Sequence, residues 1–291
     1  MKTQFVLLAL LIATAAFSQQ NKKEEKKERS RIASCKLKTA TQTSYEYVWD
    51  IKTNKFIPST KGLIVEKSTY DQKGNIIEDI LYNQVGNIDS KTTSKYDSKG
   101  NQIESAVYGS DGMMQSKIVV EYKIADTLKG FKFYDGSGNL TGTNFVDYEI
   151  TTTPEGNKVQ NLVTFFGKDT TLAGSEKSTF DSKGNLIAYA KYKGQYQSLS
   201  FRGEYSYNEK GWKIKYTEYN QNGDFYGMQK FKYDEKGYLI ERDSYGDSFG
   251  YVLATQDVAK NDTKGNIITI IYYDGKGNAK SFDKYTYTYY Q

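Results

Sequence analysis

The stretch Tyr70-Asp71-Gln72-Lys73-Gly74-Asn75 decides the fold, because close copies of it recur along most of the chain. It returns as Tyr96-Asp97-Ser98-Lys99-Gly100-Asn101 and as Phe180-Asp181-Ser182-Lys183-Gly184-Asn185. The aromatic residues are spaced alternately by 12 and 14 residues, which gives a period of 26 built from two unequal halves. Looser copies begin at Tyr82, Tyr134, Tyr207, Tyr219, Tyr233, Asn261 and Tyr273. This pattern predicts a repeat of two hairpins.

Each Asp-x-Lys-Gly segment predicts a tight turn. The aspartate carboxylate caps backbone N–H groups, and the glycine accepts the left-handed conformation that closes a three-residue hairpin loop. Between the turns remain strands of about eight residues, joined in chain order. The chain is therefore expected to be all-β, a long antiparallel up-and-down meander of about 16–18 strands. A closed or nearly closed soluble barrel is preferred, because closure removes the sheet edges, and an open spiral strip is the alternative.

Strand alternation predicts which residues share a face of the sheet. A three-residue loop places Tyr70 opposite Ile76, and even spacings would put every repeat tyrosine on that same face. The other face would receive an isoleucine that lies seven residues after the start of six of the copies. We expect these isoleucines to form a shared buried layer: Ile77, Ile103, Ile187, Ile214, Ile240 and Ile268.

The N-terminal part of the chain predicts export. Residues 1–18 have a basic start at Lys2, an apolar run from Phe5 to Phe17 and small residues around Ala16, as a signal peptide has. Residues 19–40 are rich in charges of both signs and predict a flexible linker. Residues 41–291 then form a single β domain. The protein should be exported to the periplasm, outer surface or exterior of a Gram-negative bacterium.

The composition disfavours most catalytic chemistry. The chain has no histidine and one cysteine, Cys35, so imidazole bases, most zinc sites and an activated thiolate are not expected. The 40 basic and 35 acidic residues are spread along the chain, which gives no footprint for nucleic acid. Asp135, Ser137 and Asn139 alternate like calcium ligands, but other copies carry lysine at the middle position. We therefore expect no cofactor, no metal and no enzymatic activity.

Two hypotheses concern the tyrosines. An outer-membrane barrel with aromatic girdles is the less favoured one, because the strand Tyr238–Tyr245 carries acidic residues and Arg242 on opposite faces. The sequence therefore disfavours membrane insertion. Exposed aromatic side chains on a rigid sheet can instead stack on sugar rings or contact a protein. The most aromatic stretch supplies the candidate ligand-binding residues Tyr189, Tyr192, Trp212, Tyr216, Tyr219 and Tyr226.

The Tyr-Asp-x-x-Gly-Asn copies between residues 65 and 291 resemble the YD repeats of the RHS family. That resemblance implies a long β-strip, in some members a shell around a toxin, and an association with carbohydrate. The chain is far shorter than a shell-forming member and lacks the proline-bearing motif that ends such shells. It is also similar to secreted Bacteroides proteins of unknown function with a porin-like barrel.

Together these features predict a non-catalytic envelope or surface protein that binds a ligand, with carbohydrate as the first hypothesis. The alternatives are a structural or adhesive module that contacts another envelope protein, and then an outer-membrane barrel.

Overall fold

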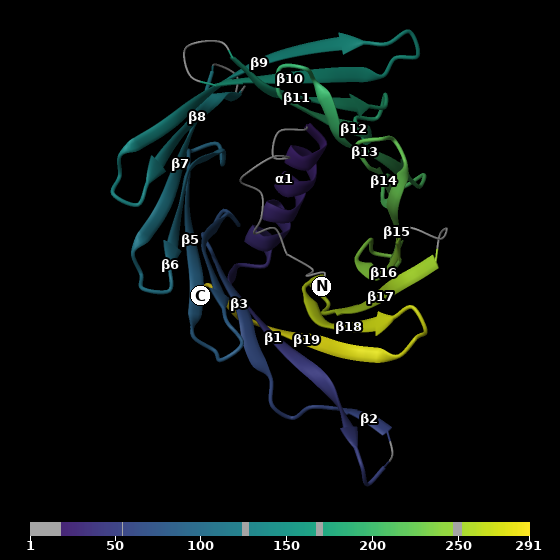
Figure 1. Cartoon of the computed structure of the whole chain (residues 1–291). Coiled ribbons are helices and arrows are strands. Elements are labelled where there is room, and N and C mark those ends of the chain that lie inside the picture. Colours follow the sequence, from purple (N-terminus) through teal and green to yellow (C-terminus); the bar gives the residue numbers. More distant parts are fainter. Residues whose placement is uncertain (1–18, 54, 124–127, 167–170, 247–251) are drawn as a thin grey trace.

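The chain forms a closed antiparallel β-barrel with a helix inside the ring of strands (Figure 1). This computed structural model describes residues 19–53, 55–123, 128–166, 171–246 and 252–291, so the predicted signal peptide 1–18 lies outside the described residues. Strand β1 pairs with β19 on one side and with β3 on the other, and β9 pairs with β10. The described residues thus close a ring of 18 strands, with β2 as one extra strand paired to β1. The predicted meander and the preferred closed barrel are confirmed.

The strands follow one another in chain order around the ring. The first half contains β1 (Leu37–Asp50), β3 (Leu63–Tyr70), β4 (Ile76–Tyr82), β5 (Ile88–Tyr96), β6 (Gln102–Gly109), β7 (Met114–Tyr122), β8 (Leu128–Asp135) and β9 (Leu140–Thr152). The second half contains β10 (Lys158–Phe166), β11 (Thr171–Phe180), β12 (Leu186–Lys193), β13 (Ser198–Tyr207), β14 (Lys213–Tyr219), β15 (Phe225–Tyr233), β16 (Leu239–Gly246), β17 (Val252–Asn261), β18 (Ile267–Asp274) and β19 (Ala279–Tyr289). The short β2 (Lys55–Pro58) continues a hairpin from β1 that projects beyond the ring (Figure 1).

The tight turns lie at two ends of the barrel. We call the end with turns 71–75, 97–101, 153–157, 181–185, 208–212, 234–238 and 262–266 the first rim. The second rim carries turns 83–87, 109–113, 135–139, 220–224 and 274–278.

The predicted turn chemistry is present in these turns. In the copy at Asp71, the backbone N–H of Asp71 donates to the carbonyl of Asn75 at 2.9 Å, and Gly74 has a φ of 82°. One carboxylate oxygen of Asp71 accepts the N–H groups of Lys73 and Asn75, each at 2.9 Å, and the other accepts the Asn75 side-chain amide. These bonds satisfy the backbone of the turn without help from the rest of the fold.

Each strand that follows such a turn carries a β-bulge near its start, apart from β10. In the first hairpin Tyr70 pairs with Ile76, as predicted, but Thr69 pairs with Glu78, so Ile77 is an extra residue without a partner. The six isoleucines of the expected buried layer are these extra residues. That prediction is wrong, since Ile77, Ile214 and Ile240 are more than one third exposed. A bulge inserts one residue and so changes which face the rest of the strand presents.

The bulges also overturn the prediction that all repeat tyrosines share one face. One bulge between Tyr70 and Tyr82 moves Tyr82 to the opposite face, and a second bulge returns Tyr96 to the face of Tyr70. Helix α1 (Gln19–Ser34) identifies the inner face, because its Ile32 packs against Tyr70. The first-rim aromatic residues therefore point into the barrel, and the second-rim tyrosines point outward.

The inward tyrosines bind the hairpins to one another. Tyr96 donates its hydroxyl hydrogen bond to the carbonyl of Ile76 at 2.9 Å, and Tyr233 donates to Lys213 at 2.8 Å. Each acceptor is the residue immediately before the bulge of the preceding first-rim hairpin, where the regular ladder is interrupted. Asn261 replaces the tyrosine and still donates to Leu239. Phe180 has no hydroxyl, and the preceding hairpin, β9–β10, pairs without a bulge.

The flexible linker expected at residues 19–40 is instead helix α1 followed by the start of β1. Within the helix, Glu28 pairs with Arg31 at 2.6 Å, and the left-handed Lys36, with a φ of 54°, turns the chain from the helix into β1. Ile32 is buried together with Leu37, Ala40 and Tyr70. The segment is ordered because the barrel wall covers its one apolar contact residue, and the single β domain therefore begins before residue 41.

Candidate functional site on the inner wall of the barrel

The inner wall is lined by polar and aromatic side chains. An 18-stranded barrel is wide enough that side chains do not fill it, as in porins of similar strand number. Its inward positions are mostly half-buried, whereas the outward Lys177, Arg202 and Lys215 are exposed. The polar and aromatic side chains of the wall thus face the interior of the barrel. Two groups of them are candidates for a functional site.

The first group lies on β11 to β14 and contains four aromatic rings. Tyr189 and Phe201 have ring centroids 5.5 Å apart with planes tilted by 45°, and Tyr205 and Tyr216 are 4.9 Å apart with a tilt of 33°. The ring of Tyr216 lies over the backbone of Gly203, where an added Cβ would come within 2.7 Å of the ring. A glycine is therefore required at position 203 for this ring to lie against the wall.

Charged groups flank these rings. Lys191 lies 3.4 Å from Glu176, and the hydroxyl of Tyr216 donates to Glu218 at 3.2 Å. Burial raises the pKa of Glu176, and the nearby ammonium of Lys191 opposes that shift. Burial also raises the pKa of the Tyr189 and Tyr216 hydroxyls, so both remain protonated donors. We call Glu176, Tyr189, Lys191, Phe201, Tyr205, Tyr216 and Glu218 the aromatic–carboxylate cluster.

The second group is acidic and lies where β1, β3, β4, β18 and β19 meet. Ser68 donates to Asp79 at 2.7 Å, and both Gln42 and Tyr272 donate to one oxygen of Asp283, at 2.7 and 2.5 Å. Burial, and then the neighbouring Asp79, raises the pKa of Glu66 to about 8. Glu66 and Asp79 share a hydrogen bond and hence a proton over the neutral pH range. We call them the acid pair.

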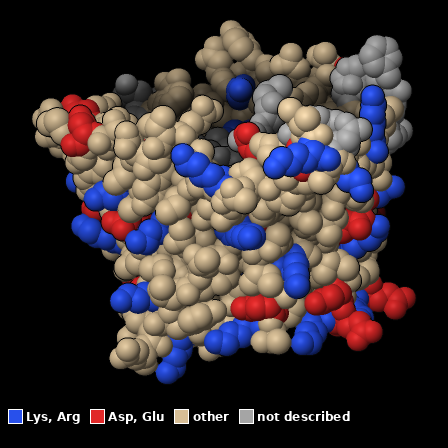
Figure 2. All heavy atoms as spheres, turned by 90° about the horizontal axis from the view of Figure 1, so that it is seen from below, with Lys and Arg blue, Asp and Glu red and all other residues tan. Residues whose placement is uncertain are grey.

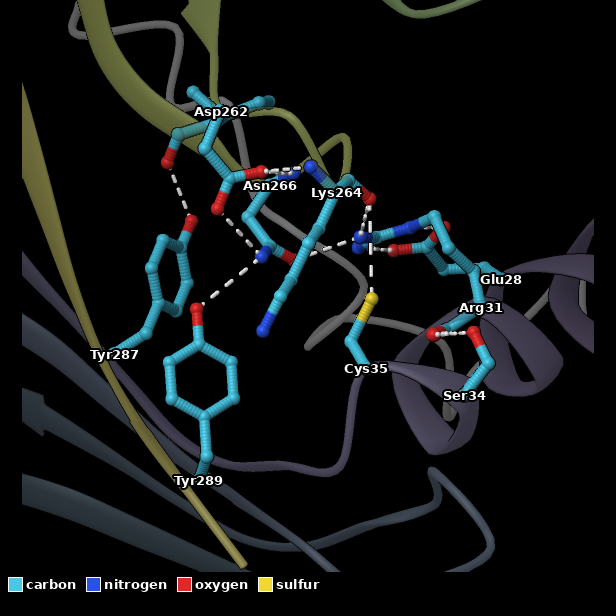
Figure 3. Close-up of polar contacts among 10 residues, drawn as sticks. Glu28, Arg31, Ser34, Cys35, Asp262, Lys264, Asn266, Tyr287 and Tyr289 are labelled. Atoms are coloured by element: carbon cyan, nitrogen blue, oxygen red, sulfur yellow. Dashed lines mark hydrogen bonds and ion pairs between the residues drawn. The ribbon is translucent and has the colours of Figure 1, made fainter.

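Helix α1 reaches the first rim beside these walls (Figure 3). Arg31 donates to the side-chain oxygen of Asn266 at 2.7 Å, and the sulfur of Cys35 lies 3.8 Å from the carbonyl of Lys264. Arg29 likewise donates to Asn75 at 3.1 Å. The asparagine of the repeat thus has two uses: its amide donates to the turn aspartate, and its oxygen receives an arginine of the helix.

The structure separates the six residues proposed from the sequence. Tyr189 and Tyr216 come together in the aromatic–carboxylate cluster. Tyr192 and Tyr219 lie on the outer face, where the guanidinium of Arg202 stacks 4.3 Å from the Tyr219 ring. Trp212 lies at the first rim against Tyr233, and Tyr226 is an exposed bulge residue near the second rim.

Sequence reasoning missed Glu176, Lys191, Phe201, Tyr205 and Glu218 as members of the cluster. Alternation alone could not reveal them, because the bulges at Ile187 and Ser200 decide which residues of β12 and β13 face inward. Gly203 is a signal within the strand, since an interior glycine often marks a close approach of another group.

The described residues contain no group of three or more His, Cys, Asp or Glu side chains arranged to hold a metal ion. Asp135, considered above as a calcium ligand, accepts the N–H groups of Ser137 and Asn139 at 2.9 and 2.8 Å, as turn capping requires. In the same part of the chain, we find no helix with the length and apolar character needed to cross a bilayer.

No protein-family model and no curated protein sequence matches the chain. Among solved structures, it is similar to a porin-like protein from Bacteroides uniformis, with a TM-score of 0.38, 8% identity, and 87% of this chain and 98% of that chain covered. A porin-like protein from Bacteroides vulgatus gives a TM-score of 0.30 at 10% identity, with 87% and 98% covered. The TcdB2-TccC3-TEV structure gives 0.34 at 11% identity; 84% of this chain is covered, but the chain spans only 14% of that protein.

Proposed function

We propose that this chain is an exported, non-catalytic binding protein of a bacterial envelope, and that its barrel holds a saccharide at the aromatic–carboxylate cluster. The observation that carries the proposal is the set of aromatic rings on the inner wall beside Glu176 and Glu218. Aromatic faces pack on the C–H faces of sugar rings, while carboxylates and an ammonium hydrogen-bond to hydroxyl groups. The half-buried positions of Phe201, Tyr205 and Tyr216 leave these groups open to the interior.

A binding role fits the state of the carboxylates better than catalysis. Glu176 is paired with Lys191, and Glu218 accepts the hydroxyl of Tyr216. Each carboxylate therefore interacts with a neighbouring side chain. A sugar hydroxyl could donate to the same carboxylate, either in place of that neighbour or in addition to it. A glycosidase would instead need a proton donor and a second carboxylate facing one another across the scissile bond.

The charged side chains on the outer face of the barrel support the proposal that this face lies in water and not in lipid. Lysine, arginine, aspartate and glutamate side chains are spread over the part of this outer face that Figure 2 shows. Lys232 pairs with Glu241 there, and Lys95 pairs with Glu104 at 2.8 Å. A lysine or arginine at mid-depth of a lipid-facing wall would cost roughly 2–4 kcal/mol.

The test is a glycan array with the chain that begins at Gln19, followed by calorimetric titration of any glycan that binds. Tyr216→Ala should weaken binding by about 10- to 100-fold, because it removes one stacking face. Tyr219→Ala is the matched control, since its ring lies on the outer face of the same strand and should leave affinity unchanged. Trp212→Ala, at the first rim, should also bind normally.

Failure of every glycan to bind would remove the saccharide proposal. Equal loss in Tyr216→Ala and Tyr219→Ala would place binding outside the cluster. Thermal unfolding of both variants distinguishes a loss of binding from a loss of fold.

A further inference from the structure

The two ends of the barrel differ in chemistry. Six first-rim turns carry a lysine immediately before the turn glycine: Lys73, Lys99, Lys183, Lys210, Lys236 and Lys264. At the described second-rim turns, the same position is occupied by Val85, Asp111, Ser137, Asn222 and Lys276. The seventh first-rim turn, 153–157, has Glu155 at this position, so six of the seven first-rim turns are basic at their tips, against one of the five second-rim turns.

Exposed apolar side chains concentrate at the second rim. Among the described residues, every large apolar side chain that is more than half exposed lies on a second-rim turn, on a strand near that rim, or on the β1–β2 hairpin that leaves it. On turns and strand ends these are Val85, Met113, Leu140, Phe166, Tyr196 and Val252. The first-rim isoleucines Ile77, Ile214 and Ile240 are only 36–39% exposed.

The hairpin adds to the same end of the molecule. Ile51 is 87% exposed and Phe56 is 60% exposed, and both lie where β1 and β2 extend beyond the ring (Figure 1). Lys52 and Lys55 flank them. Tyr226, one of the residues singled out in the sequence, is the exposed bulge residue of β15 at this rim.

We infer that the second rim docks on the surface of a lipid bilayer, with its apolar side chains in the interfacial layer and the barrel wall in water. Neighbouring strands lie about 4.8 Å apart, so side chains on successive second-rim turns stand roughly 10 Å apart along the rim. That spacing leaves the apolar groups separate, whereas the core of a protein interface is contiguous and closely packed. Lipid can fill the space between separate apolar groups.

The distribution of the exposed apolar side chains around the ring also supports a bilayer as the partner. The apolar residues lie just after β4, β6 and β12, at the start of β9 and β17 and at the end of β10, so they occupy most of the circumference. A partner that meets them together must be broad and flat. Interfacial burial of aromatic and aliphatic side chains, with lysines beside them, is how peripheral proteins hold a bilayer surface.

The experiment is co-sedimentation of the chain from Gln19 with phosphatidylcholine vesicles. This chain contains every strand of the barrel and lacks the apolar run from Phe5 to Phe17, which would itself bind lipid. We expect binding that changes little when salt is raised to about 0.5 M, because apolar burial and not charge supplies it. The triple variant Val85→Ser, Met113→Ser and Tyr196→Ser should reduce the vesicle-bound fraction at least tenfold.

The matched control is Ile77→Ser, Ile214→Ser and Ile240→Ser at the first rim, which should bind vesicles like the unaltered chain. Equal binding by all three proteins, or no binding by any, would overturn the inference. Light scattering tests whether the second rim instead binds a second copy of the chain. If the unaltered chain is a dimer and the second-rim variant is a monomer, the rim is a dimer interface, and the inference of bilayer docking is overturned. Thermal unfolding confirms that each variant is folded.

Discussion

At the scale of single residues, the repeat tyrosines fall into two groups that the motif does not distinguish. The first-rim tyrosines point inward, and Tyr96, Tyr122, Tyr207 and Tyr233 donate to carbonyls beside bulges, as Tyr96 does to Ile76. The second-rim tyrosines point outward beneath cations: the ammonium of Lys91 lies 5.0 Å from the Tyr108 ring, and that of Lys230 lies 4.9 Å from Tyr245. The same residue type thus links hairpins on one face and packs with lysines on the other.

Tyr233→Phe should lower the free energy of unfolding by about 0.5–1.5 kcal/mol, because the carbonyl of Lys213 loses its donor. Tyr245→Phe keeps its ring under Lys230 and should leave stability within about 0.5 kcal/mol. Urea unfolding of the two variants measures the difference. Equal effects would show that the hydroxyl of Tyr233 contributes nothing specific.

Glu66→Gln should change how stability depends on pH. The folded-state pKa of Glu66, about 8, lies above its ordinary value of 4.5, so the proton favours the folded state. Its contribution is complete below pH 4.5 and is lost as pH rises toward 8. The glutamine imitates the protonated acid and should stabilise the protein at pH 8 by on the order of 1–3 kcal/mol.

At pH 4.5 the variant and the unaltered chain should unfold at nearly the same temperature. Thermal unfolding across this range provides the measurement. A stability difference that does not grow with pH would show that Glu66 is ionised in the folded protein throughout.

At the scale of secondary-structure elements, α1 shows how a polar segment becomes fixed inside a barrel. Its sequence has no apolar stripe, and it is held by Ile32 on one side and by Arg29 and Arg31 at the first rim. The acceptors for the two arginines come from turns that are far apart in sequence, at Asn75 and Asn266. The docked helix therefore contacts turns from both halves of the chain.

Ile32→Asp should release α1 from the barrel, because a carboxylate would replace the side chain that packs on Tyr70. Trypsin should then cleave after Lys26, Lys27, Arg29 or Arg31 at least tenfold faster, as followed by mass spectrometry, while the strands remain intact. Ser30→Asp places the same charge on an exposed position of the helix and should be cleaved like the unaltered chain. Unchanged protection of Ile32→Asp would mean that the arginines alone hold the helix.

At the scale of the whole molecule, closure of the ring depends on β1, whose pairing with β19 and β3 joins the two ends of the meander. At this seam Thr39 and Thr288 face one another, with their hydroxyl oxygens 2.7 Å apart. Gln42 donates to Asp283 across the same seam. Among the described strands, closure leaves no long unpaired edge for other chains to pair with.

Thr39→Cys with Thr288→Cys, in a Cys35→Ser background, should form a disulfide in high yield under mild oxidation. The bond would close a loop of about 250 residues and should stabilise the barrel by up to ~5 kcal/mol in the chain-entropy estimate. Mass spectrometry after digestion identifies the bond, and unfolding with and without reductant measures its effect. A spiral strip would hold these two positions far apart, so absence of the disulfide would contradict closure.

The sequence by itself determined the turns, the strand lengths and the all-β class. An Asp-x-Lys-Gly-Asn segment satisfies its own backbone, so residues such as Asp71, Gly74 and Asn75 dictate their conformation locally. The pairing of Tyr70 with Ile76 followed from loop length alone and was predicted correctly.

Only the tertiary structure decided which face is inside, because a bulge in almost every hairpin shifts the alternation, and strand alternation read from the sequence does not include that shift. Ile77 and its counterparts were misread as a buried layer for this reason, and Glu176 and Tyr205 could not be placed beside Tyr216. Closure of the ring and docking of α1 were likewise tertiary outcomes, since both depend on contacts between residues more than 200 positions apart, such as Thr39 with Thr288 and Arg31 with Asn266.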